Sequence, residues 1–293
     1  MKSPTPELTV VIVSYRCRDL LLDCLESLAE QRDDVEMLVH VVDSASGDDT
    51  AEAARNAHPW VRIDALDENI GFSRANNRAI AEARGRAVLI LNPDTIVPRG
   101  TLRACLNELW TRPDVGVLTP RLVTLDGAFD LRCKRGFPTP WASFCYFSGL
   151  DRYLRGPRST RYTAGWRDER EAGEVEIISG AFMLAKKEAL DAIGGFDEDL
   201  PMYAEDLDLS LRFIAGGWRV WYWPEVDVVH VGGGSGDSGR RTAAANAAYF
   251  RAYGPFLRKH TAGFRGFVTA RAGSLAGEVL LAVSRLRRLL RRS

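Results

Sequence analysis

The sequence predicts an α/β fold in which helices flank a Rossmann-like, mostly parallel central sheet, with a helical tail at the C-terminus. Short runs rich in Val, Ile and Leu alternate with longer segments of helical periodicity, the pattern typical of parallel strands connected by helices. The chain has 293 residues, 46% of them hydrophobic, which is enough for one large domain with a sizeable core. These observations exclude a disordered or fibrous protein.

The first half of the chain shows this alternation clearly. LTVVIVSY (8–15) is a continuous apolar run and predicts a buried strand, and the spacing of Leu21, Cys24, Leu25 and Leu28 predicts the helix after it. The same reading continues with a strand ending at Asp43, a helix over 51–57, a strand over 61–66, a helix over 73–84 and a strand over 87–95 that ends at Asp94.

The second half is less regular. It predicts a helix over about 99–111, strands over 115–123, 175–187 and 218–231, and an acidic helix from residue 205. In that helix Leu207, Leu211 and Ile214 fall at i, i+4 and i+7, which predicts one face packed on the core. The Gly-, Pro- and aromatic-rich stretch 126–173 shows no clear periodicity, so we assign no element there.

Several strands end in acids or polar loops. Because ligands bind at the carboxyl ends of the strands in open α/β sheets, Asp43, the loop 69–72 and Asp94 are expected around one crevice.

Charge is unevenly distributed along the chain. Residues 258–293 carry nine Lys or Arg and one Glu, which leaves a net charge of −8 on residues 1–257 and argues against a nucleic-acid-binding body. The five cysteines contain no C-x-x-C pair, so neither a disulfide framework nor a zinc site is indicated and a cytoplasmic setting is expected. No apolar run approaches the ~20 residues that span a bilayer.

Six motifs occur in a characteristic order: VVIVSY, VVDSASGDDT, ENIGFSRANNRAI, LILNPDT, a long segment from ISGAFMLAKK through YAEDLDLSLRF, and VVHVGGGS. Over residues 8–260 the chain thereby resembles the family 2 glycosyltransferases with the GT-A fold, in particular bacterial rhamnosyltransferase-like members that build surface polysaccharide. The resemblance implies a GT-A domain over 1–240, with a nucleotide-binding half to about residue 95 and an acceptor and catalytic half after it. Residues 241–293 would form a C-terminal helical extension.

The activity that the resemblance implies is metal-dependent, inverting transfer of a sugar. The donor would be a nucleotide-diphosphate sugar, dTDP- or UDP-linked and including dTDP-rhamnose, and the acceptor a glycan or a lipid-linked sugar. Mn²⁺ or Mg²⁺ is the expected cofactor, because a diphosphate leaves readily only when a hard cation neutralises it.

Donor contacts are expected at several of the matching residues. Asp43 would accept the imide N–H of a pyrimidine base, although a helix N-cap network with Ser44, Ser46 and Asp48 would favour the same residue type. Gly180 and Ala181 would let the backbone approach the donor sugar, although glycine in a strand equally marks a bulge. By resemblance, the other donor contacts are Ser14, Asn69, Gly71, Asn76 and Asn77.

Asp94 is the expected metal ligand. Many relatives have D-x-D here, whereas this chain has Asn92-Pro93-Asp94, so one carboxylate is missing. By resemblance His230 is the candidate for the second ligand, and a nitrogen donor suits Mn²⁺ better than Mg²⁺. The alternatives are a Pro-Asp turn and a packed histidine.

The acidic segment holds the expected base. By resemblance Asp206 takes the proton of the acceptor hydroxyl, with Glu205 as a neighbouring acceptor contact. The alternative is that these acids only favour a helix N-terminus, and we assign Asp208 to an i,i+4 ion pair with Arg212. Further bases at Arg132, Lys134 and Arg135 are either acceptor or diphosphate contacts or ordinary surface residues.

The tail predicts an amphipathic helix with arginines on one face. Residues 275–292 would suit an anionic membrane surface at the inner face of the cell, with packing on the chain itself or on a second subunit of a homodimer as alternatives. Gly232–Gly234 would allow a mobile loop over the donor. Two rival functions remain: a sugar-1-phosphate nucleotidyltransferase, for which SYRCRD lacks the glycine-rich phosphate loop, and a non-catalytic nucleotide- or glycan-binding scaffold.

Overall fold

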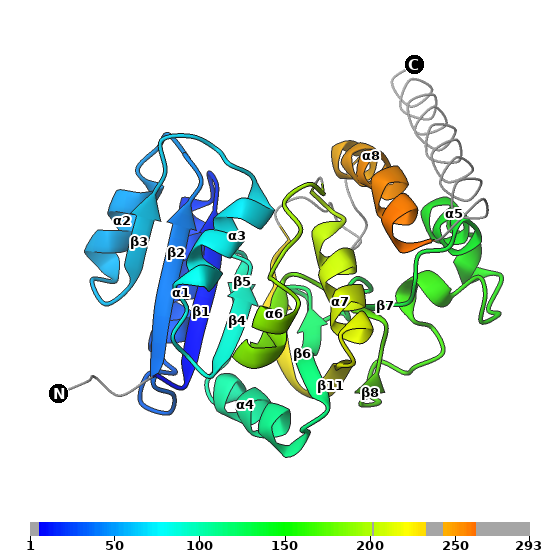
Figure 1. Ribbon diagram of the computed structural model, residues 1–293, viewed down its shortest axis with the longest axis horizontal. Coiled ribbons are helices and arrows are strands. Elements are labelled where there is room, and N and C mark those ends of the chain that lie inside the picture. The colour runs from blue at the N-terminus through cyan, green and yellow to red at the C-terminus, as the bar shows by residue number, and fades with distance from the viewer. Residues whose placement is uncertain (1–5, 201, 233–242, 262–293) are drawn as a thin grey trace.

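A computed structural model describes residues 6–200, 202–232 and 243–261 (Figure 1). The expected membrane-binding helix over 275–292 and the glycines at 233 and 234 lie outside these residues. Among the described helices, none combines the length and apolar character needed to cross a bilayer.

The first half forms the parallel part of the sheet, as the sequence predicts. Its strands lie in the order β3-β2-β1-β4 with every neighbouring pair parallel, because each connection returns through a helix. The elements are β1 (Leu8–Ser14), α1 (Arg18–Ala29), β2 (Met37–Asp43), α2 (Thr50–Ala57), β3 (Arg62–Ala65), α3 (Phe72–Ala81) and β4 (Ala87–Leu91).

The second half continues the same sheet in the order β4-β10-β6-β11-β5, with β8 paired to β11. Here β10 is antiparallel to both of its neighbours, whereas β11 is parallel to β6. The elements are β5 (Thr95–Ile96), α4 (Thr101–Thr111), β6 (Val115–Val123), β7 (Lys134–Arg135), α5 (Pro140–Ser148), the 3₁₀ helices η1 (Leu150–Arg152) and η2 (Arg161–Thr163), β8 (Gly173–Glu174), β9 (Ile177–Ile178), β10 (Phe182–Lys186), α6 (Lys187–Ala192), α7 (Glu205–Ala215), β11 (Arg219–His230) and α8 (Ala243–His260).

Two predicted strands differ from the structure. The strand predicted to reach Asp94 ends at Leu91, because Pro93 has no N–H for a ladder and the chain turns before β5. The strand predicted over 175–187 is divided into β9 and β10 by the turn at 179–181, and β9 pairs with β7 in a separate two-stranded sheet. The stretch 126–173, to which we assigned no element, contributes β7, α5 and both 3₁₀ helices.

A bulge interrupts the pairing of β11 with β6. Trp223 lies opposite Pro120 and Asp227 lies opposite Arg121, so residues 224–226 are extra on the β11 side. Beyond the bulge the pairing resumes to the end of the strand.

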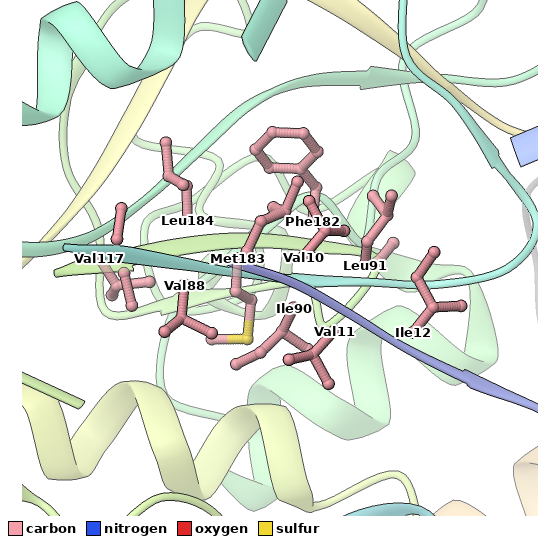
Figure 2. Packing of buried hydrophobic residues seen from close by; sticks show 14 of the residues in the cluster. Val10, Val11, Ile12, Val88, Ile90, Leu91, Val117, Phe182, Met183 and Leu184 are labelled. Carbon is pink, nitrogen blue, oxygen red and sulfur yellow. The ribbon is translucent and has the colours of Figure 1, made fainter. Parts of the chain in front are cut away.

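The main core is aliphatic and surrounds the central sheet. β1, β4, β6 and β10 are buried along their whole length, which explains their continuous apolar sequences. Figure 2 shows Phe182 and Leu184 of β10 on one face of the sheet and Met183 between them on the other. We call this core the sheet core.

A second, smaller core is largely aromatic and lies among α5, α7 and α8. Figure 1 shows α5 and α8 at the opposite end of the molecule from α2 and β3. Tyr146 stacks on Tyr162 with a centroid distance of 4.3 Å, and Tyr249 stacks on Tyr253 at 5.6 Å. The buried members of this aromatic cluster are Ala142, Tyr146, Tyr162, Ile177, Ala204, Leu207, Tyr249, Ala252, Tyr253, Phe256 and Leu257.

Candidate active site

A pocket of about 460 Å³ opens at the carboxyl ends of β1, β2 and β4. In the sheet, β2 lies on one side of β1 and β4 lies on the other, so the strand order reverses between β1 and β4. Open α/β sheets bind ligands at such a reversal. The pocket is lined by Val13, Tyr15, Arg16, Cys17, Leu20, Ser44, Asn69, Phe72, Asn92, Pro93, Asp94 and Met202.

At one end of the pocket, Asp43 lies inside a serine network. Its Oδ1 accepts hydrogen bonds from Ser14 Oγ (2.9 Å) and Ser46 Oγ (2.5 Å), and its Oδ2 accepts one from the Ser46 N–H (3.1 Å). All three residues are buried, and Ser44 rather than Asp43 lines the pocket. The structure therefore brings Ser14 and Asp43 together, and the alternative of a helix N-cap network at Asp43 is wrong, because α2 begins only at Thr50.

The loop after β3 closes one side of the pocket. Asn69 Oδ1 accepts hydrogen bonds from Ser44 Oγ (3.1 Å) and the Gly71 N–H (3.0 Å). Gly71 has φ +85°, which side chains rarely adopt, and this lets α3 begin at Phe72 directly beside the pocket. Asn69 and Gly71 thus belong to the pocket wall or its support.

The two asparagines of α3 contact the protein. Asn76 is buried and its Nδ2 donates to the Phe72 carbonyl at 3.0 Å. Asn77 exchanges two hydrogen bonds with the backbone of Phe196, at 2.9 and 2.8 Å, and also donates to Glu198. Asn77 therefore joins α3 to the loop before α7, and neither asparagine lines the pocket.

At the other end of the pocket, Asp94 and His230 lie together although 136 positions separate them in the sequence. The pairing of β5 with β11 sets Thr95 opposite His230, and the Val231 N–H donates to the Asp94 carbonyl at 2.8 Å. As a result His230 Nε2 is 3.4 Å from Asp94 Oδ1.

Asp130 holds His230 from behind. His230 Nδ1 is 2.9 Å from Asp130 Oδ2, and Arg132 contacts both oxygens of the same carboxylate at 2.9 Å. Burial raises the pKa of Asp130, but the hydrogen bonds from His230 and Arg132 outweigh it and hold that pKa well below its usual range. Burial lowers the pKa of His230, but the hydrogen bonds to its two acidic neighbours outweigh it and raise the pKa to about 9.

Sequence reasoning missed Asp130. It lies in the stretch without periodicity, and nothing near it in the sequence indicates that its partner is a histidine 100 positions later. A carboxylate that takes the second ring nitrogen of a histidine is the usual support of a metal-binding imidazole.

The Asp94 and His230 side chains would fit a divalent cation once His230 Nε2 gives up the proton that its raised pKa retains at neutral pH. Two neighbouring ligands of Mg²⁺ or Mn²⁺, each about 2.1 Å from the ion, lie about 3 Å apart, close to the 3.4 Å between these two atoms. Within the described ranges no group of three or more His, Cys, Asp or Glu side chains is arranged to hold a metal. The remaining ligands would be diphosphate oxygens and water, as is common for these ions.

Asp206 lies in the first turn of α7. Its Oδ2 accepts hydrogen bonds from Arg135 and from the Gly180 N–H (3.2 Å), and its Oδ1 accepts from the Leu207 N–H (2.8 Å). A Cβ at Gly180 would stand 3.5 Å from the Cβ of Asp206, so the turn before β10 passes directly alongside the carboxylate. Next to Gly180, the Ala181 carbonyl accepts a hydrogen bond from the Asn92 N–H at 3.0 Å. The turn at 179–181 thus connects Asp206 with the turn that carries Asp94.

Arg135 forms a buried ion pair with Asp206. Burial lowers the pKa of the guanidinium, but the charge of Asp206 outweighs it and raises that pKa above its usual value. Its Nε and Nη1 have no hydrogen-bond partner within the described part of the chain, which makes the carboxylate its main compensation. Lys134 donates to the carbonyls of Ala164 and Arg167, so the bases suspected of contacting an acceptor or diphosphate all have partners within the protein.

The remaining acids of α7 separate into two roles. Glu205 is half-buried as the first residue of the helix. Asp208 is fully buried and pairs with Arg212 at 2.6 Å, which confirms the predicted ion pair. It also binds Lys259 Nζ and His260 Nε2, each at 2.7 Å, and so anchors the end of α8.

Three comparisons with known proteins agree with this geometry. Residues 9–194 match the profile described as Glycosyl transferase family 2. The N-acetylglucosaminyl-diphospho-decaprenol L-rhamnosyltransferase of Mycobacterium tuberculosis is 31% identical over 309 residues, covering 98% of this chain and 97% of that protein.

Solved structures show the same fold at lower identity. The mannosyltransferase PcManGT from Pyrobaculum calidifontis, solved with GDP-Man and Mn²⁺, matches with a TM-score of 0.61 and 22% identity over 97% of this chain and 76% of that one. Residues 1–349 of Staphylococcus aureus TarS, solved with UDP-GlcNAc, match with a TM-score of 0.60 and 16% identity. The match covers 96% of this chain and 92% of that one.

Proposed function

Because this chain belongs to glycosyl transferase family 2, we propose that it is an inverting glycosyltransferase of cell-surface polysaccharide biosynthesis. It takes a sugar from a dTDP- or UDP-linked donor and passes it to a glycan or a lipid-linked acceptor. The name of the mycobacterial relative, which specifies a rhamnosyl group and a diphospho-decaprenol acceptor, supports a rhamnosyl donor and a polyprenyl-diphosphate-linked sugar as acceptor.

The observation that carries this proposal is the short backbone connection between the two halves of the site. Gly180 donates to Asp206 while its neighbour Ala181 accepts from Asn92, two positions before Asp94. The turn at 179–181 therefore holds the Asp206 carboxylate near the turn that carries Asp94. Inverting transfer needs a base and a diphosphate site within reach of one sugar, because the acceptor attacks opposite the leaving group.

Asp94 and His230 would hold Mn²⁺ or Mg²⁺ at the diphosphate end. When bound, such a cation neutralises the charge that develops on the departing nucleoside diphosphate. Asp130 and Arg132 fix the His230 ring, so that its Nε2 faces Asp94. The serine network around Asp43 and the Asn69 loop would receive the base and ribose.

Asp206 would act as the base. Its carboxylate takes the proton of the acceptor hydroxyl while that oxygen forms the new bond to the anomeric carbon and the bond from that carbon to the diphosphate breaks. Arg135 and the Gly180 N–H hold the carboxylate in one orientation. Glu205, one residue earlier, would contact the acceptor.

The test of the base begins with Asp206→Asn. It should lower kcat by at least about 10²-fold, because a positioned base contributes on the order of 10²–10⁴ and the amide cannot take the proton. Donor affinity, measured by titration calorimetry, should stay within a few-fold of wild type. Asp199→Asn, an exposed residue of the loop before α7, is the matched control.

A second experiment tests whether Asp206 has only a structural role. It is needed because Asp206→Asn also leaves the buried Arg135 without its counter-charge. The double variant Arg135→Met with Asp206→Asn removes that buried cation and should regain thermal stability. Its activity should stay lost. Recovery of transfer together with stability would show that Asp206 only balances Arg135.

The donor is tested by calorimetric titration with UDP, dTDP, GDP and CDP, with and without Mn²⁺. We expect a pyrimidine diphosphate to bind in a metal-dependent way, and Asp94→Ala and His230→Ala to weaken the binding. Absence of binding to all four nucleotides would favour the non-catalytic scaffold.

A further inference from the structure

The segment 141–158, formed by α5, η1 and the turn after it, exposes large apolar side chains. Trp141 is 50% exposed, Tyr153 83% and Leu154 44%. With Trp166, four of the ten exposed large apolar side chains of the described residues fall within 26 consecutive positions. Exposed apolar side chains that gather on one surface mark an interaction site, whereas isolated ones do not, and these four come from one short part of the chain.

The same segment is basic on its exposed side. Arg152, Arg155 and Arg158 are exposed, and the only acid between residues 141 and 158 is Asp151, which is half-buried. Because residues 1–257 as a whole carry a net charge of −8, this patch contrasts with the rest of the body. Trp, Tyr and Leu beside Arg are the residues that proteins place at the boundary between headgroups and acyl chains.

The segment is held rigidly from its buried side. Thr139 caps α5 by accepting the Ala142 N–H at 3.2 Å, and Pro140 begins the helix. Ala142 and Tyr146 lie in the aromatic cluster, so the opposite face, with Trp141 stacked on Phe144 at 6.0 Å, points away from it. Trp141 is therefore presented by a helix that is fixed on its buried face, and Tyr153 and Leu154 follow η1.

We propose that residues 141–158 dock this protein on the surface of a bilayer that contains anionic lipid. The arginines pair with phosphate headgroups while Trp141, Tyr153 and Leu154 enter the interface. The purpose of this docking rests on the proposed function, because a lipid-linked acceptor is met at a membrane. Along the chain, α5 is the next element after β7, where Arg135 contacts Asp206.

The experiment measures binding of the full chain to vesicles of phosphatidylcholine with and without phosphatidylglycerol, in the absence of donor and acceptor. The triple variant Arg152→Glu/Arg155→Glu/Arg158→Glu should bind the anionic vesicles at least about tenfold more weakly. Trp141→Ser/Tyr153→Ser/Leu154→Ser should weaken binding as well. All substituted side chains are exposed, and unchanged circular dichroism and Tm verify that the variants are folded.

The matched control is Arg55→Glu/Arg84→Glu/Arg99→Glu, which changes net charge equally at three exposed arginines outside the segment. It should leave vesicle binding within about twofold of wild type. Equal loss in the control, or no loss in either variant of the segment, would overturn the proposal. A variant that keeps vesicle binding but dissociates a dimer in light scattering would assign the patch to a second copy instead.

Failure here is separable from failure of the proposed function. Transfer to an acceptor dissolved in detergent should be unaffected by the arginine triple variant, and vesicle binding should be unaffected by Asp206→Asn.

Discussion

The sheet core is built on paired strands that come from residues 8–228, whereas the aromatic cluster joins helices and short segments from residues 142–257. The members of the sheet core are mostly aliphatic, although β6 and β10 also bury Arg121 and Lys186. The aromatic cluster contains tyrosine hydroxyls and borders two buried charged residues, Arg135 and Asp208. The first supports the nucleotide pocket and the second supports the side of the site that would receive the acceptor.

Helix α7 lies between these cores. Leu209 and Phe213 belong to the sheet core, whereas Ala204 and Leu207 belong to the aromatic cluster. Asp206 stands between the two sets, so its position depends on both. A change in the aromatic cluster should therefore affect the base while leaving the nucleotide pocket in place.

The largest expected effect comes from truncating the aromatic cluster. Phe256→Ala removes a fully buried ring of α8 and should lower the free energy of unfolding by about 3–5 kcal/mol. Hydrogen exchange should show α8 losing protection while β1 and β4 keep theirs. The matched change in the sheet core, Leu89→Ala, should lower protection throughout. Equal loss in both regions from Phe256→Ala would show that the cores are one cooperative unit.

The next effect concerns the polar link between α7 and α8. Asp208→Asn removes the charge that Arg212, Lys259 and His260 share, and should cost about 3 kcal/mol in urea unfolding. Asp197→Asn is the control, because Asp197 is partly exposed and its salt bridge to Lys259 is open to solvent. If Asp208→Asn lowered the free energy of unfolding no more than the control does, Asp208 would not stabilise the contact between α7 and α8.

Acid should weaken the same link. Burial raises the pKa of Asp208, but hydrogen bonds from its basic partners outweigh it and lower the pKa from 3.8 to about 2. Because the folded-state pKa lies below the unfolded one, the stabilisation is complete above about pH 4 and is lost as the pH falls towards 2. The stability difference between wild type and Asp208→Asn should shrink by about 2 kcal/mol over this range. A constant difference would contradict the assignment.

The smallest effect tests a single hydroxyl in the aromatic cluster. Tyr253 donates to the Pro138 carbonyl and accepts from Ser143 Oγ at 3.3 Å, so Tyr253→Phe should cost about 1 kcal/mol and leave those groups unpaired. Tyr153→Phe, at an exposed tyrosine, should cost nothing measurable. Thermal unfolding of the two variants measures both costs, and an equal loss of stability in the two would contradict this role of the Tyr253 hydroxyl.

The sequence predicts the two cores very unequally. Continuous apolar runs are direct evidence of buried parallel strands, so β1 to β4 and β6 could be placed to within a few residues. In the aromatic cluster only the members from α8 leave such a pattern, since Tyr249, Ala252, Tyr253, Phe256 and Leu257 recur at helical spacing within the predicted helical extension. The other members come from short segments whose contacts are set by the tertiary fold. Stretch 126–173 could not be interpreted for this reason.

The candidate site shows the same division. Motif order pointed to Asp94, His230, Gly180 and Asp206, and the structure brings them together in the two pairs Asp94–His230 and Gly180–Asp206. The supporting residues Asp130 and Arg135 could not be assigned, because a hydrogen bond across 71 or 100 positions has no local sequence signal.

The bulge in β11 makes the length of that strand as important as its composition. Since side chains alternate between the faces of a strand, the three extra residues 224–226 determine which way His230 points when it reaches Thr95. The side chain of Glu225 is exposed, so Glu225→Ala should leave nucleotide binding unchanged. Deletion of the same residue should turn His230 away from Asp94 and abolish Mn²⁺-dependent nucleotide binding. Insertions and deletions between Trp223 and Asp227 are therefore the changes that this part of β11 would tolerate least.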